Sequence, residues 1–336
     1  MIKKSDKIFV AGHNGLVGSA VVRLLKKQNY KNIITRNRQV LDLFDQKKVN
    51  LFLKKNKPKV VIISAAKVGG IKANNIFRAD FIRENLQIQT NLIHGCHINN
   101  IDNIIFLGSS CVYPRNCKLP IKEEYLLSGK LEYTNEPYAI AKIAGIKMCE
   151  SYNKQYNRKY ISLMPTNTFG PGDNYNLENS HFIPAILRKL YIAKINNEKF
   201  IKLWGSGMPK REIIYVDDLA EAIVHFINKK TKDTLINIGT SKEYSIKTIA
   251  NRIIKILKLN IKIKFDNNSK FDGVKSKVLN TNIAKSYGWK PKVKFENGVK
   301  IMLKDIKKWK TAPLWTVNSI EKATKSWFSY MKNINR

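Results

Sequence analysis

The string KIFVAGHNGLVGSAVVRLLKK, at residues 7–27, decides the fold. It opens with a short apolar run, KIFVA, which predicts a buried strand, and it places apolar residues at helical spacing in Val17–Lys27. Between them, Gly12, Gly15 and Gly18 form GxxGxxG, in which glycines allow a tight turn and let a pyrophosphate approach the helix N-terminus. Such glycines alone would also fit a packing turn. Their position after a strand and before a helix favours a dinucleotide-binding loop.

Strands and helices alternate beyond this loop. Apolar runs predict strands at residues 32–35, 60–65 and 104–108, and periodic segments predict helices at 49–55, 79–99 and 137–156. This alternation is typical of α/β proteins with a Rossmann-type doubly wound parallel sheet. We expect residues 1–170 to form the Rossmann domain, with some later segments returning to it. Gly, Pro and Asn cluster at residues 170–179, so we expect residues 171–336 to form mainly a smaller C-terminal α/β substrate lobe.

The end of the second predicted strand distinguishes NAD from NADP. An acidic residue there would bond the ribose 2′-hydroxyl of NAD, whereas an arginine accommodates the 2′-phosphate of NADP. Arg36 and Arg38 stand at this place, with Asp42 a little further along the chain. The arginines favour NADP(H) as the cofactor, although two solvated arginines would also be ordinary in a basic chain.

The composition suits a globular enzyme with two lobes. The chain has 336 residues, of which 43% are apolar, and no apolar run is long enough to suggest a membrane span. Its polar start, Met1–Asp6, lacks the features of a secretory signal. The four cysteines show neither CxxC nor metal-ligand spacing. We therefore expect free thiols, no metal site and a cytoplasmic location.

The net charge of +36 is high, yet the lysines are spread over the whole chain without a dense tail. A general compositional bias would explain this distribution. A basic surface that attracts anionic nucleotide substrates is the alternative. We expect neither a nucleic acid nor a membrane as a partner.

Tyr138 and Lys142 form YxxxK on a predicted helix, and this spacing puts both residues on one face. A tyrosine hydroxyl has a reference pKa of ~10, and a nearby lysine ammonium is expected to lower that pKa. Ser109 and Ser110 follow the strand at 104–108, where open α/β sheets place ligands. A serine hydroxyl there can bond a substrate carbonyl, so Ser109, Tyr138 and Lys142 together predict a catalytic site.

The GxxGxxG loop, the serine at the strand end and the YxxxK pair together resemble the extended short-chain dehydrogenase/reductase family. Longer strings, collinear over residues 7 to about 295, narrow the resemblance to the GDP-L-fucose synthase family: AAKVGGIKANN (Ala65–Asn75), GSSCVYP (Gly108–Pro114), NEPYAIAKIAGIKMCESYN (Asn135–Asn153), MPTNTFGPGDN (Met164–Asn174), NSHFIPA (Asn179–Ala185) and WGSGMPKREIIYVDDLA (Trp204–Ala220). The resemblance implies a 3,5-epimerase and NADPH-dependent 4-reductase that converts GDP-4-keto-6-deoxy-D-mannose to GDP-L-fucose.

That reaction needs an epimerase pair beside the reductase residues. The C4 ketone acidifies the protons on C3 and C5, and each proton must be removed and then returned to the opposite face. Cys111 and His181 fit this role, because thiols and imidazoles have reference pKa values of ~8.5 and ~6.5. In the family the matching cysteine is the base, the matching histidine is the acid, and the residue matching Tyr138 donates or accepts the proton. Taken alone, Cys111 and His181 would each more often be a structural residue.

The resemblance also assigns binding residues. Those implied for the cofactor are Gly12, His13, Asn14, Gly15, Leu16, Val17, Gly18, Arg38, Leu107, Gly108, Ser109, Ser110, Tyr138, Lys142, Pro165, Thr166, Asn167, Thr168 and His181. Those implied for the GDP-sugar are Lys189, Trp204, Arg211 and Asp272. Members of the family are commonly homodimers, so the resemblance also implies a homodimer that packs the YxxxK helix and its neighbour.

The chain departs from the family pattern in three places. Asn14 stands where arginine is usual, which weakens the expected preference for NADP and leaves it to Arg38. Lys189 stands where arginine is common, which forfeits a bidentate contact. The tail from Phe295 onward is longer than expected, and an extra helix on the second lobe is one explanation.

Two other functional classes stay open. A nucleotide-sugar 4-epimerase or dehydratase would share the fold. The first needs no Cys/His pair, and the second usually carries an acidic residue beside the serine, where this chain has Cys111. A non-catalytic redox sensor or nucleic acid binder that reuses the fold is supported only by the charge.

Overall fold

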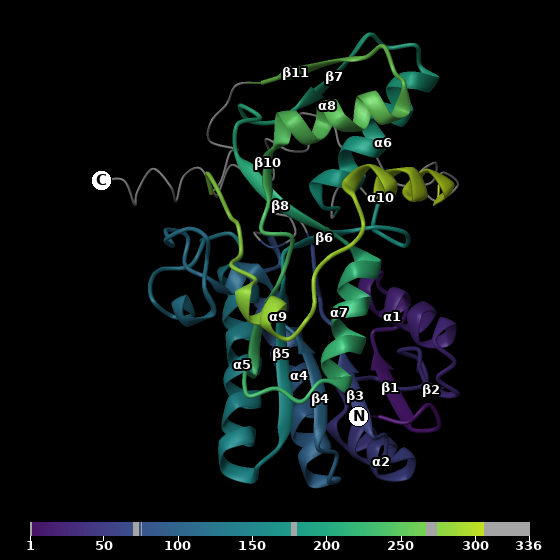
Figure 1. Cartoon of the computed structure of the whole chain (residues 1–336), viewed down its shortest axis with the longest axis vertical. Helices are drawn as coiled ribbons and strands as arrows, with labels where there is room; N and C mark the ends of the chain where they lie inside the picture. The colour runs from purple at the N-terminus through teal and green to yellow at the C-terminus, as the bar shows by residue number, and fades with distance from the viewer. Residues whose placement is uncertain (1, 70–73, 75, 176–179, 267–273, 306–336) are drawn as a thin grey trace.

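The glycine loop joins β1 (Lys7–Ala11) to α1 (Leu16–Lys27), as the sequence predicts. The structure is a computed structural model that describes residues 2–69, 74, 76–175, 180–266 and 274–305. It has a larger lobe built on the parallel sheet and a smaller lobe stacked on one end of that sheet (Figure 1).

The central sheet has six parallel strands in the order β2-β1-β3-β4-β5-β9. The strands beside β1 are β2 (Asn32–Ile34), β3 (Val60–Ile63), β4 (Asn103–Leu107), β5 (Lys159–Pro165) and β9 (Leu235–Ile238). The predicted α/β class with a doubly wound parallel sheet is confirmed. The edge strand β9 comes from far along the chain, after the smaller lobe has begun.

Helices cover both faces of this sheet, so its strands are apolar on both sides. Ile8 and Val10 of β1 pack in one core with α1 and α7 (Val216–Asn228). Phe9 and Ala11 point the opposite way, into a second core, which α2 (Gln46–Asn56), α4 (Arg78–Ile98) and α5 (Glu136–Tyr156) cover. Burial on both faces thus explains why residues 8–11 are all apolar, whereas a strand with one buried face would be apolar only at every second residue.

The predicted helix boundaries hold to within a few residues. The largest difference is in α2, which starts at Gln46 rather than Val49. Its N-cap is Asp45, whose carboxylate accepts a hydrogen bond from the backbone N–H of Lys48 at 3.0 Å. This cap stabilises a polar first turn that carries no hydrophobic periodicity, so the periodicity alone placed the start too late.

The smaller lobe has its own core and two short sheets. One has the order β10-β8-β6 and the other β11-β7. Its strands are β6 (Asn167–Phe169), β7 (Phe200–Leu203), β8 (Lys210–Tyr215), β10 (Glu243–Ser245) and β11 (Lys262–Phe265). Its helices are α6 (Phe182–Ile195), α8 (Ile246–Leu257) and α10 (Phe295–Met302). The short helix η4 (Leu303–Asp305) follows α10 directly and packs Leu303 against this core. Short elements elsewhere are α9 (Asn282–Ser286), η1 (Ser110–Val112) and η2 (Glu123–Tyr125).

The segment at residues 274–280 ties the two lobes together. The backbone oxygen of Lys275 accepts from the N–H of Lys210 in β8, and that of Val278 accepts from the N–H of Ile121 in the larger lobe, both at 2.8 Å. The buried carboxylate of Glu212 accepts from the N–H of Leu279 at 2.7 Å. This segment therefore lies fixed across the junction of the lobes.

The expectations for the C-terminal tail and for a membrane span can be compared only with the residues that the structure describes. The expected tail from Phe295 begins with α10, but residues 306–336 lie outside the described part of the chain. Over the described ranges, no helix is both long and apolar enough to cross a membrane.

Candidate active site

A cavity of about 1300 Å³ lies where the two lobes meet, at the carboxyl ends of the central strands. It is lined by all but one of the residues that the sequence proposes for the site, from the glycine loop to Arg211. The exception, Asp272, lies outside the described residues. Open α/β sheets bind ligands at this end of their strands. The structure therefore brings together residues that are up to two hundred positions apart in the chain.

The glycine loop leaves an open path to the start of α1. Gly12 has a φ of 86°, and a Cβ at this position would lie 2.6 Å from the backbone nitrogen of Ala65. A Cβ at Gly18 would lie 2.2 Å from the carbonyl oxygen of Gly12. Only glycine fits either position. Since no side chain among the described residues caps α1, its first N–H groups are available to an anion.

The end of β2 forms the far wall of the cavity. The Asn14 side chain donates to the Asn37 side chain at 3.1 Å, which joins the glycine loop to this wall. The guanidinium of Arg38 lies 4.7 Å from the ring centroid of Phe44, and its Nε lies 3.8 Å from a carboxylate oxygen of Asp42. Arg36 lies nearby, over the ring of Phe52. Two cations thus stand where a 2′-phosphate would be recognised.

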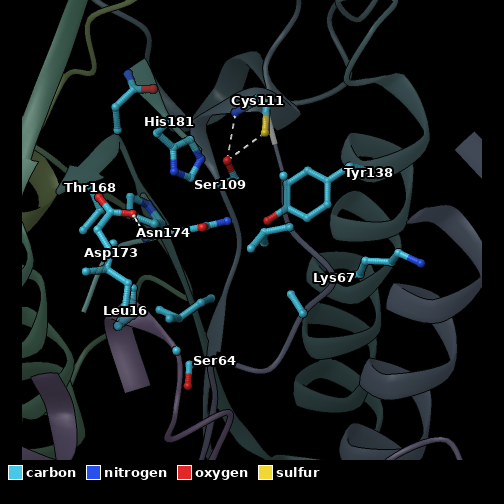
Figure 2. Close-up of a pocket in the computed structure, with 18 of the residues that line it drawn as sticks. Leu16, Ser64, Lys67, Ser109, Cys111, Tyr138, Thr168, Asp173, Asn174 and His181 are labelled. Atoms are coloured by element: carbon cyan, nitrogen blue, oxygen red, sulfur yellow. Dashed lines mark hydrogen bonds between the residues drawn. The ribbon is translucent and has the colours of Figure 1, made fainter. Parts of the chain in front are cut away.

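Ser109 and Cys111 follow directly after β4. Ser109 is the N-cap of η1, and its Oγ accepts from the backbone N–H of Cys111 at 3.3 Å. The same Oγ lies 2.7 Å from Sγ of Cys111, a direct hydroxyl–thiol hydrogen bond. Figure 2 shows both side chains pointing into the pocket, with His181 on one side and Tyr138 on the other.

Tyr138 and Lys142 lie in α5, as the YxxxK spacing predicts. Lys142 is buried, and its Nζ donates to the backbone oxygen of Leu107 at 2.8 Å and lies 5.8 Å from the ring centroid of Tyr138. Burial lowers the pKa of Lys142 to about 8. The start of this helix is held by Glu132, whose carboxylate accepts from the N–H groups of Thr134 and Asn135.

The expected effect of Lys142 on Tyr138 is absent from this structure. The pKa of the Tyr138 hydroxyl is raised, first by burial and second by the neighbouring Cys111. Burial disfavours the phenolate, and the Lys142 ammonium is directed at the Leu107 carbonyl rather than at the phenol. The prediction that lysine lowers this pKa is therefore wrong, and burial favours the protonated form of Tyr138.

His181 is the N-cap residue of α6 and faces the cavity. Desolvation in this pocket lowers the pKa of its imidazole. Beyond it, the wall of the smaller lobe carries cations. Lys189 donates to the backbone oxygen of Lys202 at 2.8 Å and lies 5.4 Å from the Trp204 ring centroid, and burial lowers its pKa to about 8. Arg211 is held by the backbone oxygen of Val274 at 2.7 Å.

Lys277 and Asp173 are among the residues that line the same cavity and that the sequence analysis did not propose for the site. Lys277, in the segment that joins the lobes, has its pKa lowered by burial, while the nearby Cys111 acts in the opposite direction. Asp173 is buried, which raises its pKa to about 7, and its carboxylate accepts from the backbone N–H of Asn174 at 2.8 Å. A single lysine carries no signal in a chain with 61 lysines and arginines. Asp173 lies inside the family string MPTNTFGPGDN, so the sequence did offer a signal for this residue.

The remaining cysteines differ from Cys111. Cys96 and Cys149 are buried, and burial raises the pKa of both thiols, that of Cys149 to about 12. Cys117 is half-buried and lies outside the cavity lining. Over the described ranges, no group of three or more His, Cys, Asp or Glu side chains is arranged to hold a metal ion.

Known proteins resemble the chain over most of its length. The profile of the NAD dependent epimerase/dehydratase family matches residues 8–239. GDP-L-fucose synthase 1 of Arabidopsis thaliana is 46% identical over 299 residues, covering 89% of this chain and 92% of the relative. GDP-L-fucose synthase of Escherichia coli is 44% identical over 303 residues, covering 88% and 94%. The NADP-bound GDP-mannoheptose C4 reductase of Campylobacter jejuni is 35% identical, with a TM-score of 0.83 over 91% of this chain and 100% of that chain.

Proposed function

Because the chain belongs to the NAD dependent epimerase/dehydratase family, we propose that it converts GDP-4-keto-6-deoxy-D-mannose to GDP-L-fucose with NADPH. Relatives named GDP-L-fucose synthase cover about nine-tenths of its length. One observation carries the proposal. The cavity that holds Ser109, Tyr138 and Lys142 also holds Cys111 and His181, so a reductase set and an epimerase pair share one substrate position.

The epimerase pair acts first in this proposal. The Cys111 thiolate takes the proton from C3 or C5, and the C–H electron pair moves into the enolate of the C4 ketone. His181 then donates a proton to the opposite face of the same carbon. Both groups exchange with solvent before the second carbon reacts. A thiol and an imidazole suit this work because their reference pKa values bracket neutral pH.

The reductase set acts on the epimerised ketone. NADPH supplies the hydride to C4. Ser109 hydrogen bonds the carbonyl oxygen, and Tyr138 donates its proton to that oxygen as the alcohol forms. A raised pKa keeps Tyr138 protonated for this step. The Lys142 ammonium lies 5.8 Å from the centroid of the Tyr138 ring and would have to turn away from the Leu107 carbonyl to support the phenolate that remains.

The cavity fits NADP(H) at its glycine end. The uncapped start of α1 suits the pyrophosphate, and Arg36 and Arg38 suit the 2′-phosphate. At the other end, the residues proposed for GDP belong to the smaller lobe. Arg211 and Lys189 supply positive charge for the diphosphate, and the half-exposed ring of Trp204 offers a surface on which guanine can stack.

The proposal also assigns a role to each lobe, a cellular location and an oligomeric state. We assign residues 1–170 and the returning strand β9 to cofactor binding, and residues 171–336 mainly to the substrate. We place the enzyme in the cytoplasm as a homodimer packed through α4 and α5. These helices expose Ile98, Ile140 and Tyr156, each more than two-fifths accessible in the single chain.

The reaction is tested by incubating the protein with GDP-4-keto-6-deoxymannose and NADPH in deuterated water. We expect NADPH to be consumed and deuterium to appear at both C3 and C5 of the product, because the returned protons come from solvent. NADPH consumption without label would contradict the epimerase role and leave a simple 4-reductase. No turnover with NADPH or NADH would favour the other nucleotide-sugar enzymes.

The cofactor preference gives a second prediction. Arg38→Ala should raise the KM for NADPH about 10-fold while leaving the KM for NADH within about twofold, since an exposed charged hydrogen bond to the 2′-phosphate is lost. Initial rates with each cofactor measure this. Arg23→Ala, which removes a guanidinium paired with Asp217 away from the β2 end, is the matched control. An equal loss with both cofactors would mean that Arg38 does not read the 2′-phosphate.

A further inference from the structure

The hydroxyl of Ser109 makes an unusual double contact with one neighbour. It accepts the backbone N–H of Cys111 at 3.3 Å and lies 2.7 Å from the sulfur of the same residue. The N-cap position of Ser109 on η1 fixes both contacts, because it places the thiol one residue inside the first turn. Within the described residues, this is the one hydrogen bond that the sulfur makes.

The Ser109 hydroxyl carries one proton, so it can donate only one hydrogen bond at a time. A serine hydroxyl donates one proton and offers two acceptor lone pairs. One lone pair takes the Cys111 N–H. A thiolate has no proton and only accepts, so with Cys111 ionised the proton of Ser109 must point at sulfur. That proton is then withheld from the carbonyl oxygen of a bound ketone.

Three ionisable groups in the described part of the chain interact electrostatically with Cys111. Tyr138 and Lys142 lie on α5, and Lys277 lies in the segment that joins the lobes. The ammonium of Lys142 is committed to the Leu107 carbonyl at 2.8 Å. Among the described residues, the Ser109 hydroxyl is the one group that is hydrogen bonded to the sulfur.

We infer, on the basis of the function proposed above, that the Ser109 hydroxyl is a switch that donates first to the Cys111 thiolate and then to the C4 oxygen of the substrate. As the thiolate takes the C3 or C5 proton, an S–H bond forms and the C–H bond breaks. The electron pair moves toward the C4 oxygen, which becomes the stronger acceptor. The hydroxyl turns to that oxygen and keeps its own proton throughout. One serine therefore serves both half-reactions.

The contact is tested first without substrate. In a Cys117→Ser background, Cys111 is the accessible thiol, because Cys96 and Cys149 are buried. Alkylation by iodoacetamide at neutral pH follows the thiolate. Ser109→Ala should slow alkylation about tenfold, the size expected for a hydrogen bond to a charged group. Ser109→Thr, which keeps the hydroxyl, should restore most of the rate. Unchanged alkylation in Ser109→Ala would overturn the inference.

The second arm measures deuterium exchange at C3 and C5 of the keto substrate with NADP⁺ in place of NADPH. Ser109→Ala should lose about 10²–10³-fold in exchange as well as in hydride transfer, because the enolate oxygen also loses its donor. Loss of hydride transfer with normal exchange would confine Ser109 to the reduction and overturn the switch. If the unaltered protein shows no exchange, the proposed function fails, and the alkylation arm still decides whether Ser109 holds the thiolate.

Discussion

Tyr138→Phe is expected to slow hydride transfer by about 10²–10⁴-fold, the range for removing a general acid. The phenol lies in the cavity beside Ser109 and Cys111, and burial holds it protonated. Phenylalanine keeps the ring and removes only the hydroxyl, so the C4 alkoxide forms without a proton donor. The rate is read from NADPH absorbance in a single turnover.

A matched control lies on the same helix. Tyr152→Phe removes a hydroxyl that bonds the His94 ring at 2.8 Å, on the face of α5 away from the cavity. We expect this variant to reduce the ketone at close to the unaltered rate. A Tyr138→Phe enzyme within twofold of the unaltered rate would remove Tyr138 from the mechanism.

Cys111→Ser should reduce solvent deuterium at C3 and C5 by about 10²–10⁴-fold. An alcohol ionises far less readily than a thiol, so the replaced side chain no longer supplies a base at neutral pH. The volume changes little, and NADP affinity should stay the same because the glycine loop and Arg38 are untouched. Mass spectrometry of the product measures the label, and fluorescence titration measures the cofactor.

Cys117→Ser provides the comparison for this variant, since Cys117 is a half-buried thiol outside the cavity lining. It should label the product normally. If Cys111→Ser still forms GDP-L-fucose at the unaltered rate, the base is another group. Lys277, which also lines the cavity, would then be the next residue to test.

Local patterns were enough for much of this protein. A strand, a glycine loop and a helix are adjacent in residues 7–27, and Tyr138 and Lys142 are one helical turn apart, so the first dinucleotide unit and the YxxxK face followed from spacing. Ser109 was placed correctly at the end of a strand for the same reason. The family strings then brought Cys111 and His181 into the prediction, although residue chemistry alone left their roles open.

The features that the sequence did not predict correctly depend on contacts between residues that are distant in the chain. Strand β9 joins the central sheet through pairing with β5, which no periodicity near residue 235 could indicate. Lys277 lines the same cavity as Cys111 and interacts with it electrostatically, because hydrogen bonds to both lobes fix its segment across the cavity. The expected lowering of the Tyr138 pKa failed because burial and the direction of the Lys142 ammonium are set by packing, not by the i, i+4 spacing. The sequence determined which groups are present and which of them lie on one local face. Only the tertiary structure decided which groups meet, because desolvation and hydrogen-bond direction depend on every element around the site.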